Sequence, residues 1–317
     1  MSKLIGESSA RECFGSFRAW RHGRCSANDE SVRMEPRNLR KQFHGSKSRE
    51  ARSLAAHADT LREQGCYHEA EALFRQAIAL AEQAFGPNHL EVAAILNNMA
   101  VLLKYTGRFD EAESLYGRAL AITQQSLGAN HPDVAAIYHN LGGLEHARGR
   151  YAAGELFARQ SVEIREKALG PDHVDVAADV AALAAILDGQ RRYDESEPLY
   201  HRVLAIFEKA YGPEHYEIAI NLNNLAALKH AKRMFAEAMR LYQRALAIKE
   251  KLLGPGHPDV ATTLNNLAAL LTAMGEREKA AQLYGRALVI YQKTLQPTHP
   301  KVAGCRRNLE RCQRSIR

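Results

Sequence analysis

The chain has 317 residues, of which 46% are hydrophobic and 25% charged, and its formal net charge is +7. No stretch approaches the roughly 20 consecutive apolar residues that a membrane-spanning helix needs, and the first 19 residues lack the apolar core of a secretory signal. The five cysteines are scattered and odd in number, which argues against a disulfide framework and favours a reducing compartment. These features predict a cytoplasmic protein without a membrane anchor.

The positive charge is concentrated at the N-terminus. Residues 1–50 carry 11 Lys/Arg against 6 Asp/Glu, whereas the remaining residues carry a balance of only +2. This segment mixes Arg, Ser, Gly and Asn without the helical period found downstream, so we predict a mostly disordered basic arm over residues 1–50. The basic character of the chain is therefore weak evidence that the folded part, residues 51–317, binds nucleic acid.

A repeat dominates the rest of the chain. The motif His-x-[Asp/Glu/Lys]-[Val/Ile]-Ala recurs six times, and every interval is 42 residues; it begins at His89, His131, His173, His215, His257 and His299. One spacing kept over five intervals is the signature of a repeat architecture. Between the motifs, apolar residues recur with helical period on two segments per repeat. The pattern predicts six helix-turn-helix units.

Pro, Asp and Gly residues mark the ends of these helices. Pro132 and Pro258 suit the first helical position, and Gly107 and Gly128 suit helix C-termini. The predicted helix pairs are 51–65/67–85, 90–106/109–127, 132–148/151–169, 174–190/193–211, 216–232/235–253 and 258–274/277–295. A last helix, about 300–315, has no partner and is predicted to cap the stack. The expected fold is an all-α, right-handed α-solenoid.

Some repeats depart from the common pattern. Arg191 and Arg233 stand where four other repeats have a mid-repeat glycine. In the fourth repeat, Ala181, Ala182 and Ala185 replace polar residues, and Pro198 falls inside the second helix, where we expect a local kink.

The sequence favours a structural role for the periodic histidines and offers no catalytic constellation. Equivalent atoms in stacked units are separated by about the width of a helix pair, far beyond the Zn–N distances near 2.0–2.1 Å. Each histidine is therefore expected to pack against or cap the start of a helix. No nucleophile elbow, phosphate-binding loop or His-Glu-x-x-His motif is present, so no enzyme activity, cofactor or metal is predicted.

Individual motifs resemble a known family. Asn97-Asn98-Met99-Ala100, followed by Gly107-Arg108-Phe109-Asp110-Glu111-Ala112, resembles a tetratricopeptide repeat, TPR. The 42-residue step, with Leu-Gly-Pro between repeats and Asn-Asn-Leu-Ala in the first helix, resembles the kinesin light chain class of that family. The resemblance spans residues 51–317. It implies that the first helix of each repeat lines an inner groove that binds a peptide.

The recurring asparagines of the first helices are the leading candidates for such binding. Asparagine is a mediocre helix former, so its repeated use inside helices needs a reason. One interpretation is that the second asparagine of each pair hydrogen-bonds the neighbouring helix. The other is a ladder of amides that binds the backbone of an extended peptide.

Residues on the same predicted helix face complete the candidate site, including three arginines of the last helix that favour an acidic ligand. The lysine position of the clamp that some TPR proteins use for chaperone C-termini is occupied by Asn or His in this sequence. The candidate peptide-binding residues are Asn97, Asn98, Val101, Lys104, Tyr105, His139, Asn140, His146, Asn223, Asn224, His230, Asn265, Asn266, Thr272, Arg307, Asn308, Arg311 and Arg314.

The predicted function is that of a scaffold or adaptor that binds a protein or peptide, and the arginines of the last helix favour an acidic one. Two alternatives stay open from the sequence. The basic arm suits a nucleic-acid-associated protein, although its few aromatic residues are not interleaved with arginine as single-strand binding favours. A purely structural oligomerisation module is the other alternative.

Overall fold

The computed structural model describes residues 36–295 and 299–314, which form helices joined by short turns, with side chains described from residue 45 onward. Thirteen α-helices and no strand lie in those ranges. They form two compact units, one ending at Gly170 and the other beginning at Pro171. The prediction of an all-α fold built from solenoid-type helix pairs is confirmed.

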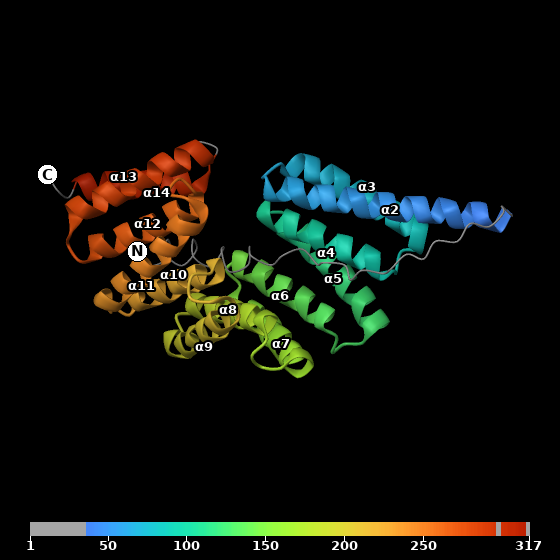
Figure 1. Cartoon of the computed structure of the whole chain (residues 1–317), viewed down its shortest axis with the longest axis horizontal. Coiled ribbons are helices and arrows are strands. Elements are labelled where there is room, and N and C mark those ends of the chain that lie inside the picture. The colour runs from blue at the N-terminus through green and yellow to red at the C-terminus, as the bar shows by residue number, and fades with distance from the viewer. Residues whose placement is uncertain (1–35, 296–298, 315–317) are drawn as a thin grey trace. The chain divides into compact units, whose positions relative to one another are not determined.

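The N-terminal unit contains three helix pairs (Figure 1). These are α2 (Pro36–Glu63) with α3 (Tyr67–Phe85), α4 (Leu90–Tyr105) with α5 (Phe109–Leu127), and α6 (Pro132–Ala147) with α7 (Tyr151–Leu169). Each helix packs on its partner, and α3 and α5 also pack on the first helix of the next pair. The first helices of successive pairs, α2, α4 and α6, contact one another in turn.

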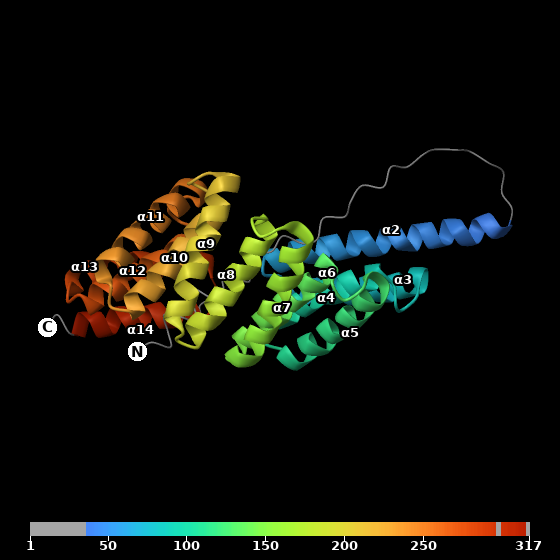
Figure 2. The same cartoon turned by 90° about the horizontal axis from the view of Figure 1, so that it is seen from below.

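The C-terminal unit repeats this arrangement and adds a single last helix (Figure 2). Its pairs are α8 (Val174–Gly189) with α9 (Tyr193–Tyr211), α10 (Tyr216–Ala231) with α11 (Phe235–Leu253), and α12 (Pro258–Ala273) with α13 (Arg277–Thr294). The last helix, α14 (Pro300–Arg314), packs on α13 and contacts α12. Its buried thiols, Cys305 and Cys312, donate to the carbonyl oxygens of Tyr284 and Arg277 at 3.4 and 3.2 Å.

Small residues let the helices of a pair approach closely. In α5, Ala112 and Ala119 are fully buried on either side of the buried ring of Tyr116. A larger side chain at either alanine would push the neighbouring helix away and cost roughly 1–3 kcal/mol. The same spacing recurs at Ala238, Tyr242 and Ala245 of α11. The 42-residue pattern is thus a packing pattern as well as a sequence pattern.

The first pair differs at the positions where later pairs contact the pair before them. Later repeats bury the residues there, and in α4 these are the apolar Ile95, Met99 and Leu102. The corresponding residues of α2, one 42-residue step earlier, are Ser53, His57 and Thr60, and all are exposed. Polar side chains on this face keep the end of the stack compatible with water.

The helix limits agree with the predicted ones to within one residue except in α2. This helix begins at Pro36 and not at residue 51, so residues 36–50 are helical where a disordered arm was expected. Residues 1–35, the rest of that predicted arm, lie outside the described residues. Helix α9 continues through Pro198 as one helix from Tyr193 to Tyr211.

Two arginines adopt backbone angles that normally require glycine. Arg191 and Arg233 both have φ of 61°, in the left-handed region, at the mid-repeat turns where other repeats have Gly65, Gly107 or Gly149. The turn geometry is therefore the same in all of these repeats, and the two arginines adopt it at a conformational cost.

Candidate protein-interaction surface

The periodic histidines fix the start of each first helix. In every one of the six motifs, Nδ1 of the histidine accepts a hydrogen bond from the backbone N–H two residues later, at 3.1–3.3 Å. A side-chain acceptor at this position satisfies one of the free N–H groups of a helix N-terminus. The expected capping role of these histidines is confirmed.

The asparagines of the N-terminal unit form a chain of hydrogen bonds that joins its first helices. Nδ2 of Asn98 donates to Oδ2 of Asp59 in α2 at 2.8 Å, and Nδ2 of Asn97 donates to Oδ1 of Asn98 at 3.3 Å. Nδ2 of Asn140 in α6 then donates to Oδ1 of Asn97 at 2.9 Å. Asn98 and Asn140, at the second asparagine position of their repeats, therefore bond to the first helix of the preceding repeat, which was the first of the two sequence interpretations.

The C-terminal unit has an equivalent bond. Nδ2 of Asn266 in α12 donates to Oδ1 of Asn223 in α10 at 3.4 Å, and both residues are buried, as is Asn224. These amides hold neighbouring helices at a defined register. Any contact with a ligand must then come mainly from the less buried residues beside them.

The predicted site residues differ widely in exposure, and each unit contains its own set. In the N-terminal unit, Tyr105 is exposed, whereas Asn97, Asn98 and Val101 are half-buried. In the C-terminal unit, the exposed ones are Arg307, Arg311 and Arg314, and the half-buried ones are Asn265, Thr272 and Asn308. The buried ones are Lys104, His139, Asn140, His146, Asn223, Asn224, His230 and Asn266.

Burial shifts the pKa values of the ionisable side chains at one position of the repeat, near the C-terminal end of the first helix. Lys104 of α4 and Asp188 of α8 are two repeat steps apart in the sequence. Burial lowers the pKa of Lys104 to about 8, and the nearby charge of Arg62 lowers it further. Burial raises the pKa of Asp188 to about 7, although hydrogen bonds from Ser196 and Tyr200 oppose the rise. His230, one step further along, also has a pKa lowered by burial.

Sequence reasoning missed the polar partners that the second helices supply at this register. The hydroxyl of Tyr200 donates to Oδ2 of Asp188 at 2.9 Å, and the hydroxyl of Ser196 donates to Oδ1 of the same carboxylate. The recurrence of tyrosine at Tyr116, Tyr200, Tyr242 and Tyr284, always at multiples of the repeat, was the available signal. Because these tyrosines also fit the hydrophobic period, the sequence alone does not separate a polar role from a role in packing.

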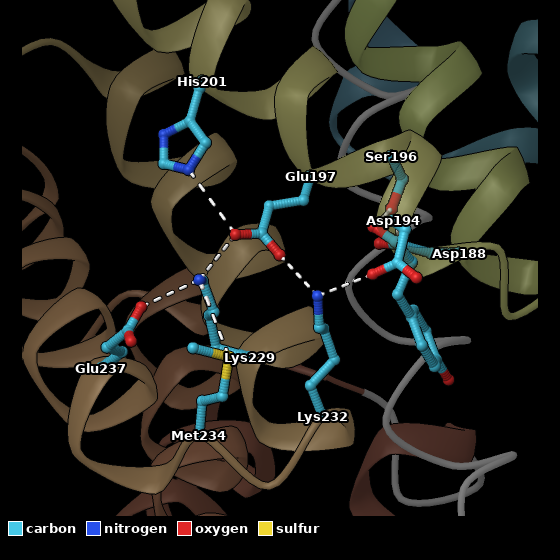
Figure 3. Close-up of polar contacts among 10 residues, drawn as sticks. Asp188, Asp194, Ser196, Glu197, His201, Lys229, Lys232, Met234 and Glu237 are labelled. Carbon is cyan, nitrogen blue, oxygen red and sulfur yellow. Dashed lines mark hydrogen bonds and ion pairs between the residues drawn. The ribbon is translucent and has the colours of Figure 1, made fainter.

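Two charge clusters tie the C-terminal ends of first helices to the preceding second helices. In the C-terminal unit, Glu197 of α9 lies between Lys229 of α10 and Lys232, just after that helix (Figure 3). Lys229 also pairs with Glu237 at 2.8 Å, and Lys232 with Asp194 at 2.9 Å. Figure 3 also shows His201 on the other side of Glu197, 4.0 Å from its carboxylate.

The N-terminal unit forms its cluster around one arginine. Arg148, just after α6, pairs with Asp110 and Glu113 of α5 at 2.6 Å each and with Glu145 at 2.7 Å. Asp110, Glu113 and Arg148 precede Asp194, Glu197 and Lys232 by two repeats each. The two clusters therefore occupy the same position in the repeat.

Neither a metal-binding cluster nor a membrane-spanning segment is found among the residues with described structure. Within residues 36–295 and 299–314, no three His, Cys, Asp or Glu side chains gather as metal ligands would. Over the same ranges, no helix has both the length and the apolar character to cross a bilayer.

The repeated helix pairs define a helical repeat protein, and its first helices carry the hydrogen-bonded asparagines described above. The tetratricopeptide repeat family model matches residues 49–125, 91–167, 176–251, 218–293 and 259–316. The chain belongs to the tetratricopeptide repeat family. This fold generally mediates protein–protein interactions, and the scaffolds built on it are generally not enzymes.

Solved structures with the same fold include kinesin light chain-like TPR proteins. BtubC (BKLC) from P. vanneervenii is 26% identical with a TM-score of 0.55, over 80% of this chain and 91% of its own. A putative kinesin light chain repeat protein from Podosopora anserina is 27% identical with a TM-score of 0.53, over 65% and 98% of the two chains. The apo form of RapI, 13% identical with a TM-score of 0.58 over 84% and 98%, shows the fold alone. No curated protein sequence matches the chain.

Proposed function

We propose that this protein is an interaction scaffold that binds a peptide segment of a partner protein along the first helices of its repeats. The observation that carries the proposal is the row of polar residues on these helices. Asparagines in it are hydrogen-bonded between successive first helices, and half-buried and exposed side chains lie beside them. A surface of this kind offers donors and acceptors in fixed positions, so a ligand has little ordering cost to overcome on the protein side.

The buried asparagines position this surface more than they contact the ligand. Asn266 is 1% exposed and its amide donates to Asn223, so its replacement removes a bond between helices. The side chains that we propose for direct contact are the exposed or half-buried ones, which include Tyr105 and Val101 in the N-terminal unit and Asn265 and Thr272 in the C-terminal unit.

The last helix adds a preference for acidic ligands. Arg307, Arg311 and Arg314 lie at i, i+4 and i+7 of α14, and all are exposed. The acidic residue Glu310 is the one negative charge within α14. Electrostatic complementarity of this kind raises association rates and discriminates between partners more than it raises affinity.

Site-specific photo-crosslinking of the full chain tests the proposal. Peptides are first selected from a displayed library, and a photoreactive residue is then placed at Tyr105 or Thr272, or, as controls, at Leu156 and Val289, which are exposed on the second helices α7 and α13. The selected peptides are expected to crosslink from the first two positions and not from the controls. Crosslinking confined to Leu156 and Val289 would show that the ligand binds the second helices and would reject the proposal.

The acidic preference has its own matched pair of variants. Arg311→Glu reverses a charge in α14, whereas Arg240→Glu reverses one on an exposed position of α11. We expect Arg311→Glu to weaken acidic peptides by about tenfold and Arg240→Glu to leave them nearly unchanged. Equal effects of the two substitutions would show that only the overall charge of the protein matters.

A further inference from the structure

The first helix of the first pair is much longer than the repeat requires. Helix α2 has 28 residues, whereas α4 has 16. The residue one 42-residue step before the start of α4 is Ser48, so α2 begins twelve residues earlier than its repeat equivalent. These residues, 36–47, form the α2 extension and add about 18 Å of helix. Figures 1 and 2 both show α2 continuing past the end of α3.

The packing of α2 against its neighbours begins where the extension ends. Nζ of Lys47 donates to Oε1 of Gln83, two residues before the end of α3, at 3.0 Å. Among the side chains of α2 that the structure describes, Ala51 is the first to be buried. Gly45 lies earlier in the helix, and a methyl group on its Cα would meet no atom within 4 Å. The helix surface around Gly45 is therefore open to a ligand.

The α2 extension has basic residues and no acidic ones. Its Lys/Arg residues are Arg37, Arg40, Lys41 and Lys47, and Arg49 follows two residues later. Lys47 and Arg49 donate to neutral acceptors, which are the amide of Gln83 and the carbonyl of Gly45. Along the described side chains of α2, ion pairs begin only with Arg52, which pairs with Glu91 at 2.6 Å. Carboxylates of the described helices therefore leave the charge of Lys47 and Arg49 without an ion pair.

The helical conformation of the extension gathers these basic residues. Arg37, Arg40, Lys41 and His44 stand at i, i+3, i+4 and i+7, which is the spacing of one helix face. The helix dipole adds positive charge at the N-terminus of α2, and no acidic residue lies in its first turn. A helix with this distribution of charge attracts a polyanion.

Among polyanions, B-form DNA fits this helix best. A helix with its side chains is about 10–12 Å in diameter, and the major groove of B-form DNA is about 12 Å wide. The major groove of double-stranded RNA is too narrow, and single strands are bound by aromatic stacking, for which the extension offers Phe43 as its single Phe, Tyr or Trp. An anionic lipid surface requires a broad apolar helix face, whereas Leu39 and Phe43 are the two large apolar residues of the extension.

We propose that the α2 extension binds the major groove of double-stranded DNA, with Arg37, Arg40 and Lys41 against the phosphates. This activity goes beyond the scaffold function and does not depend on it. Contacts to phosphates carry little sequence information, so the binding is non-specific and its dissociation constant is on the order of 1–100 µM at physiological salt. The helical conformation of residues 36–50, where a disordered arm was expected, is what favours a duplex over a single strand.

Fluorescence anisotropy of the full chain with a labelled DNA duplex of random sequence tests the proposal. Double-stranded RNA and single-stranded DNA of the same sequence are compared with it, and vesicles of phosphatidylserine are tested by flotation. We expect the DNA duplex to bind most tightly, and the logarithm of its dissociation constant to rise with the logarithm of the salt concentration with a slope of about 3–4. Tighter binding of either other nucleic acid, or binding to the vesicles without binding to the duplex, would overturn the proposal.

Two triple variants with the same change of net charge locate the binding. The first replaces three basic residues of the extension, as Arg37→Gln, Arg40→Gln and Lys41→Gln. The control replaces three exposed basic residues of second helices, as Lys167→Gln, Lys209→Gln and Arg240→Gln. We expect the first variant to bind the duplex about tenfold more weakly with a salt slope smaller by about 2–3, and the control to change the affinity by less than about twofold. Equal effects of the two variants would show that only the net charge matters and would reject the site.

Two single substitutions that keep every charge test whether the extension binds as a helix. Gly45→Ala places a methyl group in open space and favours the helix, whereas Gln42→Pro removes a helical hydrogen bond and breaks it. We expect Gly45→Ala to tighten the binding of the duplex by about twofold and Gln42→Pro to weaken it by about fivefold. Circular dichroism verifies that the rest of the array stays folded in both variants. Equal affinities of the two variants would show that an unstructured basic chain binds as well as the helix, which would overturn the proposal.

Discussion

Lys104 of the N-terminal unit and Asp188 of the C-terminal unit occupy the same register position but carry opposite charges. Lys104 is buried and Asp188 is half-buried, and desolvation moves both pKa values toward neutrality, to about 8 for Lys104 and about 7 for Asp188. A tyrosine of the following helix has the same offset from each, Tyr116 and Tyr200. Asp188 uses the hydroxyl of Tyr200 as a donor, whereas the hydroxyl of Tyr116 has no partner.

The two side chains also differ in the partners that the structure shows for them. Asp188 receives hydrogen bonds from Ser196 and Tyr200 of its own helix pair, one to each carboxylate oxygen. At Lys104, the positive charge of Arg62 adds to the effect of burial, and both lower the pKa. The same position of the repeat therefore holds a carboxylate with two hydroxyl donors in one unit and a lysine influenced by a second cation in the other.

The two units also differ in the charge clusters that stabilise the ends of their first helices. Arg148 satisfies three carboxylates with one planar guanidinium, whereas Lys229 and Lys232 share the task in the C-terminal unit. Arginine presents several donors in a fixed fork, whereas each lysine is a compact charge on a flexible stem. Removing one residue should therefore cost more in the N-terminal cluster.

The largest expected effect is the loss of Arg148. Arg148→Met leaves the buried carboxylate of Glu145 without its 2.7 Å partner, and we expect the unfolding free energy to fall by about 3 kcal/mol. Lys232→Met, at the same register, leaves Glu197 paired with Lys229 and should cost about 1 kcal/mol. Amide hydrogen exchange in α6 and α10 measures each unit separately, because a repeat array need not unfold in one step.

The surface pair Arg159–Glu155 provides the control for both variants. The side chain of Arg159 is about half exposed, and Arg159→Met is expected to change stability by less than about 0.5 kcal/mol. Equal losses for Arg148→Met and Lys232→Met would show that the two clusters contribute alike.

The next effect is a pH dependence that Asp188 confers on the C-terminal unit. Its folded pKa, about 7, lies above the ordinary 3.8, so the folded state binds this proton more tightly than the unfolded state. This contribution to stability is complete below about pH 4 and is lost as the pH rises through 7. Relative to Asp188→Asn, the wild-type unit should lose on the order of 2–4 kcal/mol between pH 4 and pH 8.

Denaturant midpoints at a series of pH values test this expectation. Asp172→Asn, a substitution at an exposed carboxylate of the same unit, is the control and should follow the wild-type curve. Parallel stability curves for wild type and Asp188→Asn would contradict the assigned shift.

A smaller effect on stability is expected at a buried position of the first helices that is apolar in the N-terminal unit and polar in the C-terminal unit. Ile95 and Ile137 of the N-terminal unit are buried at a register where the C-terminal unit has Asn221. The amide of Asn221 donates to the carbonyl of Glu217, but its Oδ1 is buried without a partner. Asn221→Val should therefore stabilise the protein by about 1 kcal/mol, measured as a rise in the denaturant midpoint.

An exposed position on the next helix gives the matched control. Gln243→Val in α11 reports the intrinsic cost of valine in a helix, which is about 0.5 kcal/mol. If Asn221→Val loses as much stability as Gln243→Val, the buried oxygen of Asn221 has a partner, and the expected gain from an apolar residue at this position is contradicted.

The smallest expected effect concerns the mid-repeat turns. Arg233→Gly removes a side chain from a residue at φ of 61° and should raise stability by about 0.5 kcal/mol. Gly275→Ala, at φ of 87° in the next repeat, is the converse change and should lower stability by about 1 kcal/mol. Thermal unfolding of both variants measures the two shifts, and shifts of the same sign would contradict a shared turn geometry.

The sequence by itself determined the helices, their order and their caps. A period of 42 residues and the turn residues around it are local signals, so helix limits were predicted to within one residue from α3 to α14. The capping role of His89 and its equivalents is also local, because each histidine accepts from an N–H only two residues away. Residues 36–50 were the exception, since their sequence lacks the repeat period that located the other helices.

Only the tertiary structure decided which polar side chains are partners and which are exposed. Asn98 bonds to Asp59, and Asp188 to Tyr200, across separate helices whose mutual rotation a period does not specify. The same asparagine pattern is compatible with a buried bond between helices and with contact to a ligand. Burial, which depends on all the neighbours at once, chose between these for Asn140 and Asn266, and it also set the pKa values of Lys104 and Asp188.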